Sequence, residues 1–260
     1  MTHAANVQVA EPTDPPAGAS GTPLPPETVQ DPRDAPGVGV NSVGITVTTG
    51  DKVLVLGDFK VGKTTLVRVL LRPFEKTWAF DPTWAMPGGR HSVEEALADY
   101  NATGHGIYQP YPADWEDGFE KWCSVAMTLD NTMTFIDEPS LVLRPTGTIP
   151  ISFSALWRLG HKRGNGCILA THRWHGDLPA LTRIFDHLFA FRMTVDNDVD
   201  ELADLIGDEA AEYVRRQPNR AFFHKASGET GGQAYTGIPE ETVKAMNGLV
   251  KTGEPPSKHN

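Results

Sequence analysis

The sequence predicts an α/β domain with a mostly parallel central sheet flanked by helices. Between residue 43 and about residue 195, apolar runs of strand length alternate with segments of helical period. Strands that alternate with helices are typical of a parallel sheet with right-handed crossovers. The chain has 260 residues, which is enough for one sizeable core with tails. A small C-terminal extension follows the predicted domain.

The first long strand leads into a glycine-rich loop. The apolar residues 53–56 end at Gly57, and Gly57, Gly62, Lys63 and Thr64 fit the spacing G-x-x-x-x-G-K-[ST], directly before a helical pattern. Backbone N–H groups of such a loop and the following helix N-terminus surround phosphate oxygens. Lys63 then reaches the β- and γ-phosphates, and the Thr64 hydroxyl can ligate Mg²⁺. The residues predicted to bind the nucleotide are Gly57, Asp58, Phe59, Lys60, Val61, Gly62, Lys63, Thr64 and Thr65.

The elements around this loop follow from apolar periodicity and turn residues. Alternating apolar residues from 43 to 47 indicate a short strand before the first long one. Ser92 and Glu95 form a capping box at the start of a helix. The elements predicted after the loop helix are a strand over 77–80, a helix from 92 to about 100, a strand over 105–111 and a helix over 115–129.

A second apolar strand ends in two adjacent acids. Residues 132–136 are followed by Asp137 and Glu138. An acidic pair at a strand end means little alone, but after a phosphate-binding loop it has a defined role. Asp137 is expected to hold Mg²⁺, and Glu138 to orient and polarise the attacking water. The predicted metal ligands are therefore Thr64 and Asp137.

A further strand follows the acidic pair and ends in polar residues. A helical pattern around residues 153–157 leads into the basic segment 160–166, and the strand over 167–170 is followed by Thr171 and His172. This order fits the additional-strand branch of P-loop ATPases, in which the extra strand lies between the two strands that carry the nucleotide motifs. Thr171 or His172 then emerges beside the γ-phosphate, where it can sense the phosphate and relay its presence to the subunit surface.

The remaining patterns complete the domain and its extension. They predict a short helix around 181–185, a last core strand over 188–191, helices over 201–206 and 209–216, and a hairpin over 221–235. We therefore expect a RecA-like core over residues 43–195. The C-terminal helices and hairpin of residues 196–250 are expected to pack on this core.

Both ends of the chain are predicted to be disordered. Residues 1–42 are rich in Pro, Gly, Ala and Thr and contain almost no large apolar side chains. Such a segment cannot bury enough apolar surface to offset the entropy of ordering. A docking arm that folds on a partner is the alternative interpretation. The polar tail of residues 251–260 is also expected to be disordered.

Composition limits the possible partners. The formal net charge is −10, so the whole molecule is not a general polyanion binder, and any contact with nucleic acid needs a local basic patch. Cys123 and Cys167 form no metal or redox motif and are expected to be reduced core thiols. No apolar run approaches the ~18–20 residues of a membrane span, and the N-terminus lacks a signal-peptide layout. We expect a soluble intracellular protein without stable membrane insertion.

Taken together, the motifs resemble those of the FtsK–HerA superfamily of DNA-pumping ATPases. Within it, the chain is most similar to the compact genome-packaging ATPases of membrane-containing viruses. The resemblance covers roughly residues 50–195 and depends on residues 57–64, 80–82, 107–110, 135–138 and 160–173. The last stretch is similar to the family's G-R-K-x-G-x-G-hydrophobic-[ST]-Q-R sequence. It discriminates best, because the two nucleotide motifs are shared by many families.

The resemblance implies a function. It implies that ATP hydrolysis, with Mg²⁺, drives translocation of double-stranded DNA, in the viral members into a preformed capsid. It further implies a homo-oligomeric ring of six subunits, a capsid vertex or portal protein as partner, and a location in the host cytoplasm or the virion. Relatives in cell division and conjugation usually carry membrane or further DNA-reading domains, so the small size favours packaging. A cellular DNA-transfer or segregation ATPase is the alternative.

Two positions depart from the family pattern. His172 stands where the family has a sensor Gln; it can donate a hydrogen bond to phosphate, but its charge depends on pH. His161 stands where the family has Arg, so an arginine that completes a neighbouring subunit's site has to come from elsewhere. Arg163 is our candidate, with Arg158 and Arg173 as alternatives and Lys162 as a weaker one, because lysine lacks a planar guanidinium. The predicted catalytic residues are Lys63, Glu138, Arg163 and His172.

Other P-loop classes fit less well. Residues 137–140 and His172 resemble motifs of ABC-type ATPases, but no LSGGQ-like signature precedes Asp137. A P-loop kinase needs an arginine-rich lid and a regulatory GTPase needs an [NT]-K-x-D motif, and the sequence contains neither. A nucleotide-gated scaffold that barely hydrolyses ATP does not need an acid that orients water, so the presence of Glu138 argues against this class.

Overall fold

The computed structural model describes residues 4–7, 12–13, 45–143, 149–174, 183–229 and 231–238. The strands are β1 Ala4–Val7, β2 Pro12–Thr13, β3 Ile45–Thr48, β4 Lys52–Leu56, β5 Thr77–Phe80, β6 His105–Tyr108, β7 Met133–Asp137, β8 Gly166–Thr171, β9 His187–Phe191, β10 Phe222–Ala226 and β11 Gln233–Tyr235. The α-helices are α1 Lys63–Leu71, α2 Val93–Thr103, α3 Trp115–Ala126, α4 Ile151–Leu159, α5 Asp196–Ile206 and α6 Asp208–Arg216. Among the described residues, no helix has the length and apolar composition needed to cross a membrane.

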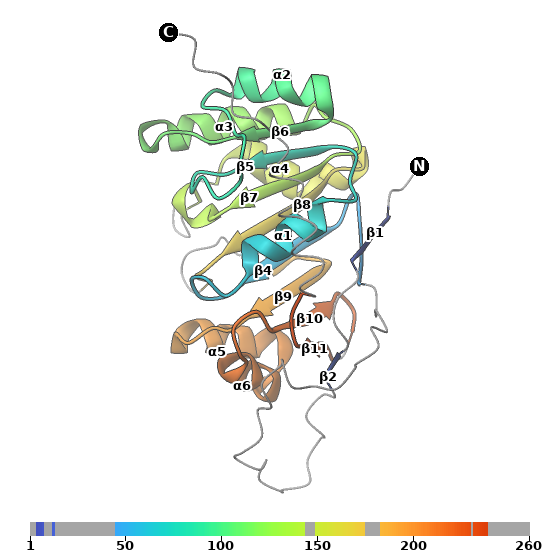
Figure 1. The fold of residues 1–260 in the computed structure, drawn as a ribbon, viewed down its shortest axis with the longest axis vertical. Coiled ribbons are helices and arrows are strands. Elements are labelled where there is room, and N and C mark those ends of the chain that lie inside the picture. Colours follow the sequence, from blue (N-terminus) through green and yellow to red (C-terminus); the bar gives the residue numbers. More distant parts are fainter. Residues whose placement is uncertain are drawn as a thin grey trace, which may run out of the picture.

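One nine-stranded sheet organises the molecule (Figure 1). Its strand order is β2-β11-β10-β9-β4-β8-β7-β5-β6. The six strands from β9 to β6 pair in parallel, and β10, β11 and β2 add to the β9 edge in antiparallel. The predicted fold class, a mostly parallel sheet flanked by helices, is confirmed. The additional strand β8 lies between β4 and β7, as the sequence predicts.

The strand register brings three loops together at one edge of the sheet. Leu56, at the end of β4, pairs with Thr171, and Asp137, at the end of β7, pairs with Ala170. Parallel strands that end at the same level release their following residues side by side. The segments after β4, β7 and β8 therefore meet at this edge.

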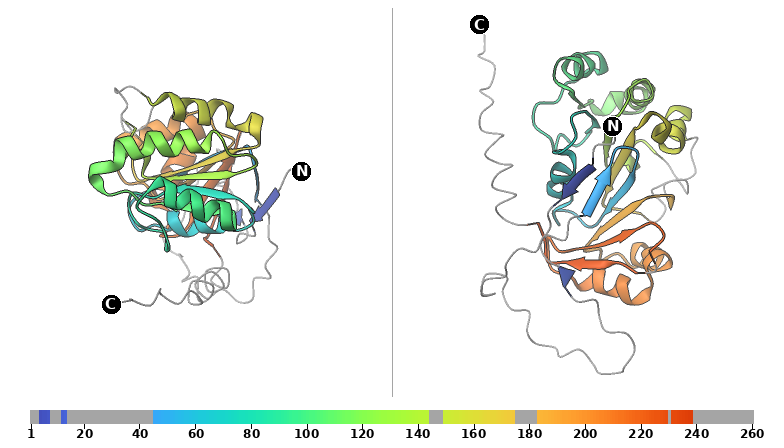
Figure 2. Two further views of the ribbon diagram at one scale, coloured as in Figure 1. Left: turned by 90° about the horizontal axis from the view of Figure 1, so that it is seen from above. Right: turned by 90° about the vertical axis from the view of Figure 1, so that its right-hand side faces the viewer.

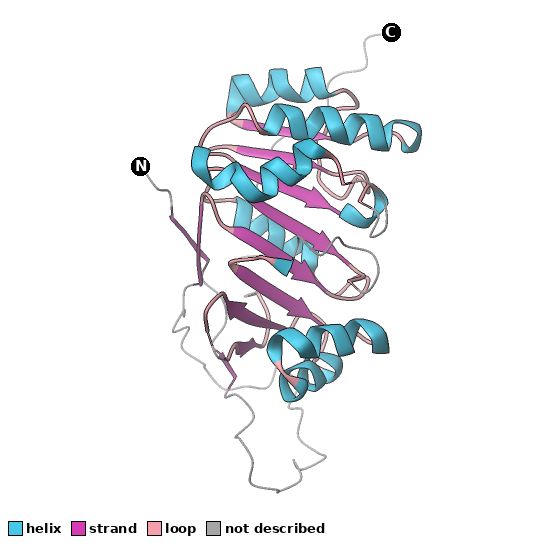
Figure 3. Ribbon diagram, turned by 180° about the vertical axis from the view of Figure 1, so that it is seen from behind, coloured by secondary structure: helices cyan, strands magenta, loops and turns pink. Residues whose placement is uncertain are grey.

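Two apolar cores lie on the two faces of the sheet. Because successive strand side chains point to opposite faces, Val53 and Val55 of β4 enter one core, and Leu54 and Leu56 enter the other. Helix α1 covers the first face, whereas α2 to α6 contribute to the second core (Figures 1 and 3). Burial on both faces explains why the parallel strands read as continuous apolar runs.

Several element boundaries differ from the predicted ones. Strand β6 ends at Tyr108, because Gln109 turns its N–H to the carbonyl of Arg90 and Pro110 has no N–H to continue the ladder. Helix α5 begins at Asp196, five residues before the predicted start, since its first turn is acidic and shows no apolar period. At α2, Ser92 Oγ accepts the N–H of Glu95 at 3.2 Å, as the capping box requires.

The C-terminal hairpin extends the main sheet. Strand β10 pairs with β9 over five residues, from Phe222 with Phe191 to Ala226 with His187, and β11 pairs with β10. Helices α5 and α6 pack beside this end of the sheet (Figure 1). The extension is thus continuous with the core sheet.

Two short strands lie within the N-terminal segment predicted to be disordered. Strand β1 pairs with β3, and β2 pairs with β11 at the sheet edge (Figure 2). Edge pairing uses main-chain hydrogen bonds and does not require large apolar side chains, so composition gave no sign of it. Other parts of that segment, the 251–260 tail and residues 181–182 of the predicted 181–185 helix lie outside the described residues, and residues 184–185 are not helical.

Candidate nucleotide-binding site

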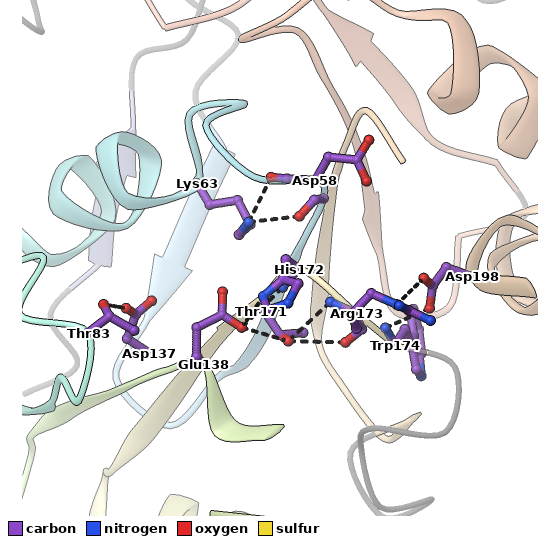
Figure 4. Close-up of polar contacts among 11 residues, drawn as sticks. Asp58, Lys63, Thr83, Asp137, Glu138, Thr171, His172, Arg173, Trp174 and Asp198 are labelled. Carbon is purple, nitrogen blue, oxygen red and sulfur yellow. Dashed lines mark hydrogen bonds and ion pairs between the residues drawn. The ribbon is translucent and has the colours of Figure 1, made fainter. Parts of the chain in front are cut away.

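A cavity of about 600 Å³ lies at the edge of the sheet where the segments after β4, β7 and β8 meet. The motif residues that line it are Phe59, Lys60, Val61, Gly62, Lys63, Thr64, Thr65, Asp137, Glu138 and His172. Thr83, Ala85, Leu141 and Arg220 complete the described wall. The structure therefore brings the phosphate-binding loop, the acidic pair and the predicted sensor around one space (Figure 4).

The phosphate-binding loop needs glycine at two positions. Gly57 has φ 149°, and a Cβ there would lie 2.5 Å from the Cβ of Phe191. Gly62 has φ 116° and immediately precedes α1, so the free N–H groups of the helix N-terminus face the cavity. The Asp58 N–H bonds the carbonyl of Arg192, which fixes the loop to the segment after β9.

Lys63 is the buried cation of a cavity wall that exposed Lys60 and Arg220 also line. Its ammonium donates to the carbonyl oxygens of Gly57 at 2.7 Å and Asp58 at 2.9 Å. Burial lowers the pKa of Lys63, although the carboxylates of Glu138, Asp137 and Asp58 oppose that shift. An ammonium held by loop carbonyls at the first residue of α1 is in place to exchange these bonds for phosphate oxygens.

Asp137 is the more buried member of the acidic pair, at 5% exposure. Its carboxylate accepts a hydrogen bond from the Thr83 hydroxyl. Burial raises the pKa of Asp137 to about 7; the nearby Asp81 and Glu138 carboxylates add to the rise, while Thr83 and Lys63 oppose it. Asp137 is therefore a carboxylate whose charge needs a nearby cation.

Asp81 organises the loop behind Asp137. It is fully buried and accepts hydrogen bonds from the N–H of Ala85 at 3.0 Å, the N–H of Met86 at 2.7 Å and the Gln109 amide at 2.8 Å. The loop so held presents Thr83 to Asp137. Sequence reasoning noted Asp81 and Gln109 only as parts of the family resemblance and missed Thr83. The available signal was Asp81 itself, an acid directly after the apolar strand 77–80.

Glu138 leaves β7 in a left-handed backbone conformation, with φ 44°, directly before Pro139. Such a conformation is uncommon for a residue with a side chain and clusters at functional sites. Its Oε2 accepts bonds from the Thr171 hydroxyl at 3.2 Å and from the backbone N–H of His172 at 3.3 Å, and His172 Nδ1 lies 2.7 Å away. The residue predicted to activate water is thus in direct contact with the predicted sensor.

The donor atoms at the cavity fit a magnesium ion bound together with phosphates. Mg²⁺ prefers oxygen ligands and is usually held by one or two protein groups with phosphates and water. Thr64 and Asp137 offer a hydroxyl and a carboxylate, and Glu138 adds a second carboxylate to the same wall. Among the described residues, no three His, Cys, Asp or Glu side chains converge as an all-protein metal cage.

The segment after β8 connects the cavity to α5. Arg173 Nε pairs with Asp198 of α5 at 2.8 Å, and the backbone N–H of Trp174 donates to the other oxygen of the same carboxylate, also at 2.8 Å (Figure 4). Asp198 is 1% exposed. His172 therefore lies between Glu138 and Arg173, which pairs with the buried Asp198 of α5.

Arg163 does not reach the cavity of its own chain. It ends the 3₁₀ turn Gly160–Arg163, before the start of β8, whereas the cavity lies after the end of that strand. Its guanidinium bonds the carbonyls of Thr128 at 2.9 Å and Leu129 at 3.1 Å and pairs with Asp130 at 2.9 Å. These contacts give Arg163 a local structural role, and its action in a neighbouring subunit stays a prediction.

The other predicted arginines differ in their surroundings. Arg173 is bound to Asp198, as described above, and Arg158 is exposed on α4. Sequence reasoning missed Arg220, which is the arginine that lines the cavity within the described part of the chain. It belongs to no motif and precedes a strand of the C-terminal hairpin.

A second, larger cavity of about 710 Å³ lies among β3, β9, β10 and β11. Its described wall includes His187 and His224, whose rings are stacked with centroids 5.4 Å apart. No residue of the nucleotide motifs is among the described residues that line it. We therefore place the chemistry in the smaller cavity.

Comparison with known proteins gives a structural likeness. No protein-family model matches the chain, and no curated protein matches it by sequence. The genome packaging NTPase B204 from Sulfolobus turreted icosahedral virus 2, in complex with ATP-gammaS, aligns over 74% of this chain and 99% of its own, with TM-score 0.61 and 18% identity. The fold is shared with a genome-packaging NTPase.

Related structures give the same result. The AMP complex of the same B204 aligns with TM-score 0.59 and 19% identity over 73% of this chain and 98% of its own. B204 from Sulfolobus turreted icosahedral virus, a DNA-packaging ATPase, aligns with TM-score 0.54 and 16% identity over 73% and 98%. At these identities the likeness establishes the fold. It confirms the fold that the resemblance to the FtsK–HerA superfamily implies.

Proposed function

We propose that this protein hydrolyses ATP with Mg²⁺ and uses the energy to move double-stranded DNA into a preformed viral capsid. The observation that carries the proposal is the arrangement of Lys63, Asp137, Glu138 and His172 around one cavity at the start of α1. The fold shared with B204, itself named as a genome packaging NTPase, supports the same function. Each residue has a role that its contacts support.

The proposed cycle begins with nucleotide binding. The backbone N–H groups of residues 57–65 hold the phosphates. The Lys63 ammonium exchanges its hydrogen bonds to loop carbonyls for bonds to the β- and γ-phosphates. Thr64 and Asp137 would hold Mg²⁺, which would supply charge neutralisation at the phosphates. Asp137, whose surroundings disfavour its ionised form, would be ionised more readily beside such a cation.

Glu138 acts on the attacking water. Thr171 and His172 hold one of its carboxylate oxygens, which leaves the other free to accept a proton or orient water. His172 lines the cavity and contacts Glu138, so it can exchange that contact for a phosphate oxygen. Arg173, the next residue, pairs with Asp198, so a change at His172 can pass from the phosphate to α5.

The DNA and assembly parts of the proposal go beyond the geometry of one chain. The proposed motor is a homo-oligomeric ring, six subunits by family resemblance, docked on a capsid vertex or portal protein in the host cytoplasm or virion. An arginine from the neighbouring subunit, with Arg163 as first candidate, completes each site. Because the chain is acidic overall, its contact with DNA depends on a local basic surface that grips phosphates without reading sequence.

Steady-state ATP hydrolysis with and without double-stranded DNA tests the proposal. We expect hydrolysis that DNA stimulates and that added salt weakens, because phosphate contacts release counterions. The Glu138→Gln variant is expected to bind ATP and lose hydrolysis by roughly 100-fold or more, the usual scale for a general base. Glu120→Gln, an exposed site on α3, is the matched control. Normal turnover by Glu138→Gln would remove the mechanism, and hydrolysis indifferent to DNA would favour an ATPase that does not act on DNA.

A further inference from the structure

Arg220 is fixed to the phosphate-binding loop by its backbone. It lies between α6 and β10, far from the nucleotide motifs in sequence, and its N–H donates to the carbonyl of Val61 at 3.0 Å. Its φ of 74° is uncommon for a residue with a side chain. Such an outlier at a cavity wall is a reason to look for a function.

The side chain of Arg220 lies beside the start of α1. A Cβ at Gly62 would meet both the Cα and the Cγ of Arg220 at 3.7 Å. The chain after β11 returns to the same place, because a Cβ at Gly237 would lie 3.1 Å from the Arg220 carbonyl oxygen. Ile238, which follows Gly237, lines a small hollow of about 50 Å³ together with Arg220, Gly62 and Thr65. In the described part of the chain, no side-chain hydrogen bond or ion pair occupies the exposed Arg220 guanidinium.

The strand order sets the direction in which a nucleotide lies in the cavity. Asp137 and Glu138 follow β7, on one side of β4, whereas Arg220 precedes β10, which lies beyond β9 on the other side. Hydrolysis requires the γ-phosphate to lie near Glu138, with Lys63 at the β- and γ-phosphates. The end of the nucleotide that carries the ribose and base is therefore directed to the Arg220 side.

We propose that Arg220 and Ile238 form the nucleoside end of the nucleotide site. The planar guanidinium of Arg220 lies on the face of the base, a contact that combines stacking with attraction between a cation and a π system. Ile238, partly buried against the apolar core, supplies the opposite apolar surface. This inference rests on the proposed nucleotide binding and assigns a residue outside every motif to it.

Calorimetric titration of the full chain with two ligands tests the inference. One ligand is the non-hydrolysable analogue adenosine 5′-(β,γ-imido)triphosphate, and the other is inorganic tripolyphosphate, which lacks ribose and base; both are used with Mg²⁺. We expect Arg220→Ala to weaken binding of the analogue about tenfold, the scale of a partly desolvated cation–π contact. Binding of tripolyphosphate is expected to stay unchanged, which also shows that the loop is intact. Arg220→Lys keeps the positive charge but not the planar guanidinium, so it should weaken binding of the analogue nearly as much as Arg220→Ala does.

Arg216→Ala is the matched control, because Arg216 lies on α6 and pairs with Glu212 away from the cavity. Equal loss of analogue and tripolyphosphate in Arg220→Ala would place the guanidinium on phosphate and overturn the assignment to the base. Unchanged binding of both ligands would also overturn it. If the wild-type chain binds neither ligand, the proposed function itself fails, and the nucleoside site with it.

Discussion

Replacing Asp137 with asparagine is expected to stabilise the fold while it removes the metal ligand. Burial, with the nearby Asp81 and Glu138 charges, raises the pKa of this carboxyl to about 7, from an ordinary value of 3.8. At pH 8 the folded protein therefore holds an anion that its surroundings disfavour. Asparagine keeps the size of the side chain and an oxygen that can accept from Thr83, but carries no charge.

The magnitude and its pH dependence follow from the two pKa values. The folded pKa lies above the unfolded one, so the penalty is largest above pH 7 and declines as the pH falls toward 3.8. With about 1.4 kcal/mol per pKa unit, it is about 4 kcal/mol at pH 8 and about 2 kcal/mol at pH 5. The Asp137→Asn variant should exceed the wild type in unfolding free energy by roughly these amounts, more at pH 8 than at pH 5.

Guanidinium chloride unfolding at pH 8 and pH 5, followed by tryptophan fluorescence with a chelator present, measures this difference. Asp204→Asn, an exposed position on α5, is the control and should change the unfolding free energy by less than about 0.5 kcal/mol. The reasoning is refuted if Asp137→Asn is no more stable than the wild type at pH 8. It is equally refuted if the stabilisation grows on acidification, because that sign belongs to a carboxyl whose folded pKa is depressed.

Two further outcomes are expected. Burial and the neighbouring His187 lower the pKa of His224 to about 3. The contribution of neutral His224 to the unfolding free energy is therefore fully present above pH 6.5 and falls by about 2 kcal/mol on reaching pH 5, where the unfolded chain binds the proton. His224→Phe should remove this loss in unfolding titrations at pH 8 and pH 5, and an unchanged pH dependence would contradict the assignment. Lys63→Ala should weaken nucleotide binding about 100-fold in calorimetry, since charged hydrogen bonds contribute roughly 1.5–3 kcal/mol each. The control Lys162→Ala, at an exposed position, should leave the affinity unchanged. Equal nucleotide affinities of Lys63→Ala and the wild type would exclude Lys63 from the phosphate site.

The sheet and the nucleotide motifs could be predicted because their signals are local. Buried parallel strands read as continuous apolar runs, and a glycine-rich loop between a strand and a helix has few other uses. The strand order did not follow from periodicity. It required the rule that an additional strand lies between the two motif strands, and the pairing of β8 with both β4 and β7 confirmed it.

The residues that sequence reasoning missed come to the cavity through tertiary structure. Thr83 reaches Asp137 because buried Asp81 holds the intervening loop, and Arg220 reaches the phosphate loop through a bond to the Val61 carbonyl. Neither residue has a periodic or spaced partner in the sequence. The short strand β1 was missed for a related reason, since its pairing uses main-chain groups that every residue except proline carries.

The position of β8 accounts for the contact between the predicted sensor His172 and Glu138, the predicted general base. Because this strand lies between β4 and β7, the residue that follows Thr171 has to emerge between the phosphate loop and Glu138, whatever its side chain. A hydrogen-bond donor is all that this place requires, and both a histidine and a glutamine provide one. The contact of His172 with Glu138 is consistent with this reasoning. We therefore infer that a change from Gln to His at this place keeps a hydrogen-bond donor beside Glu138.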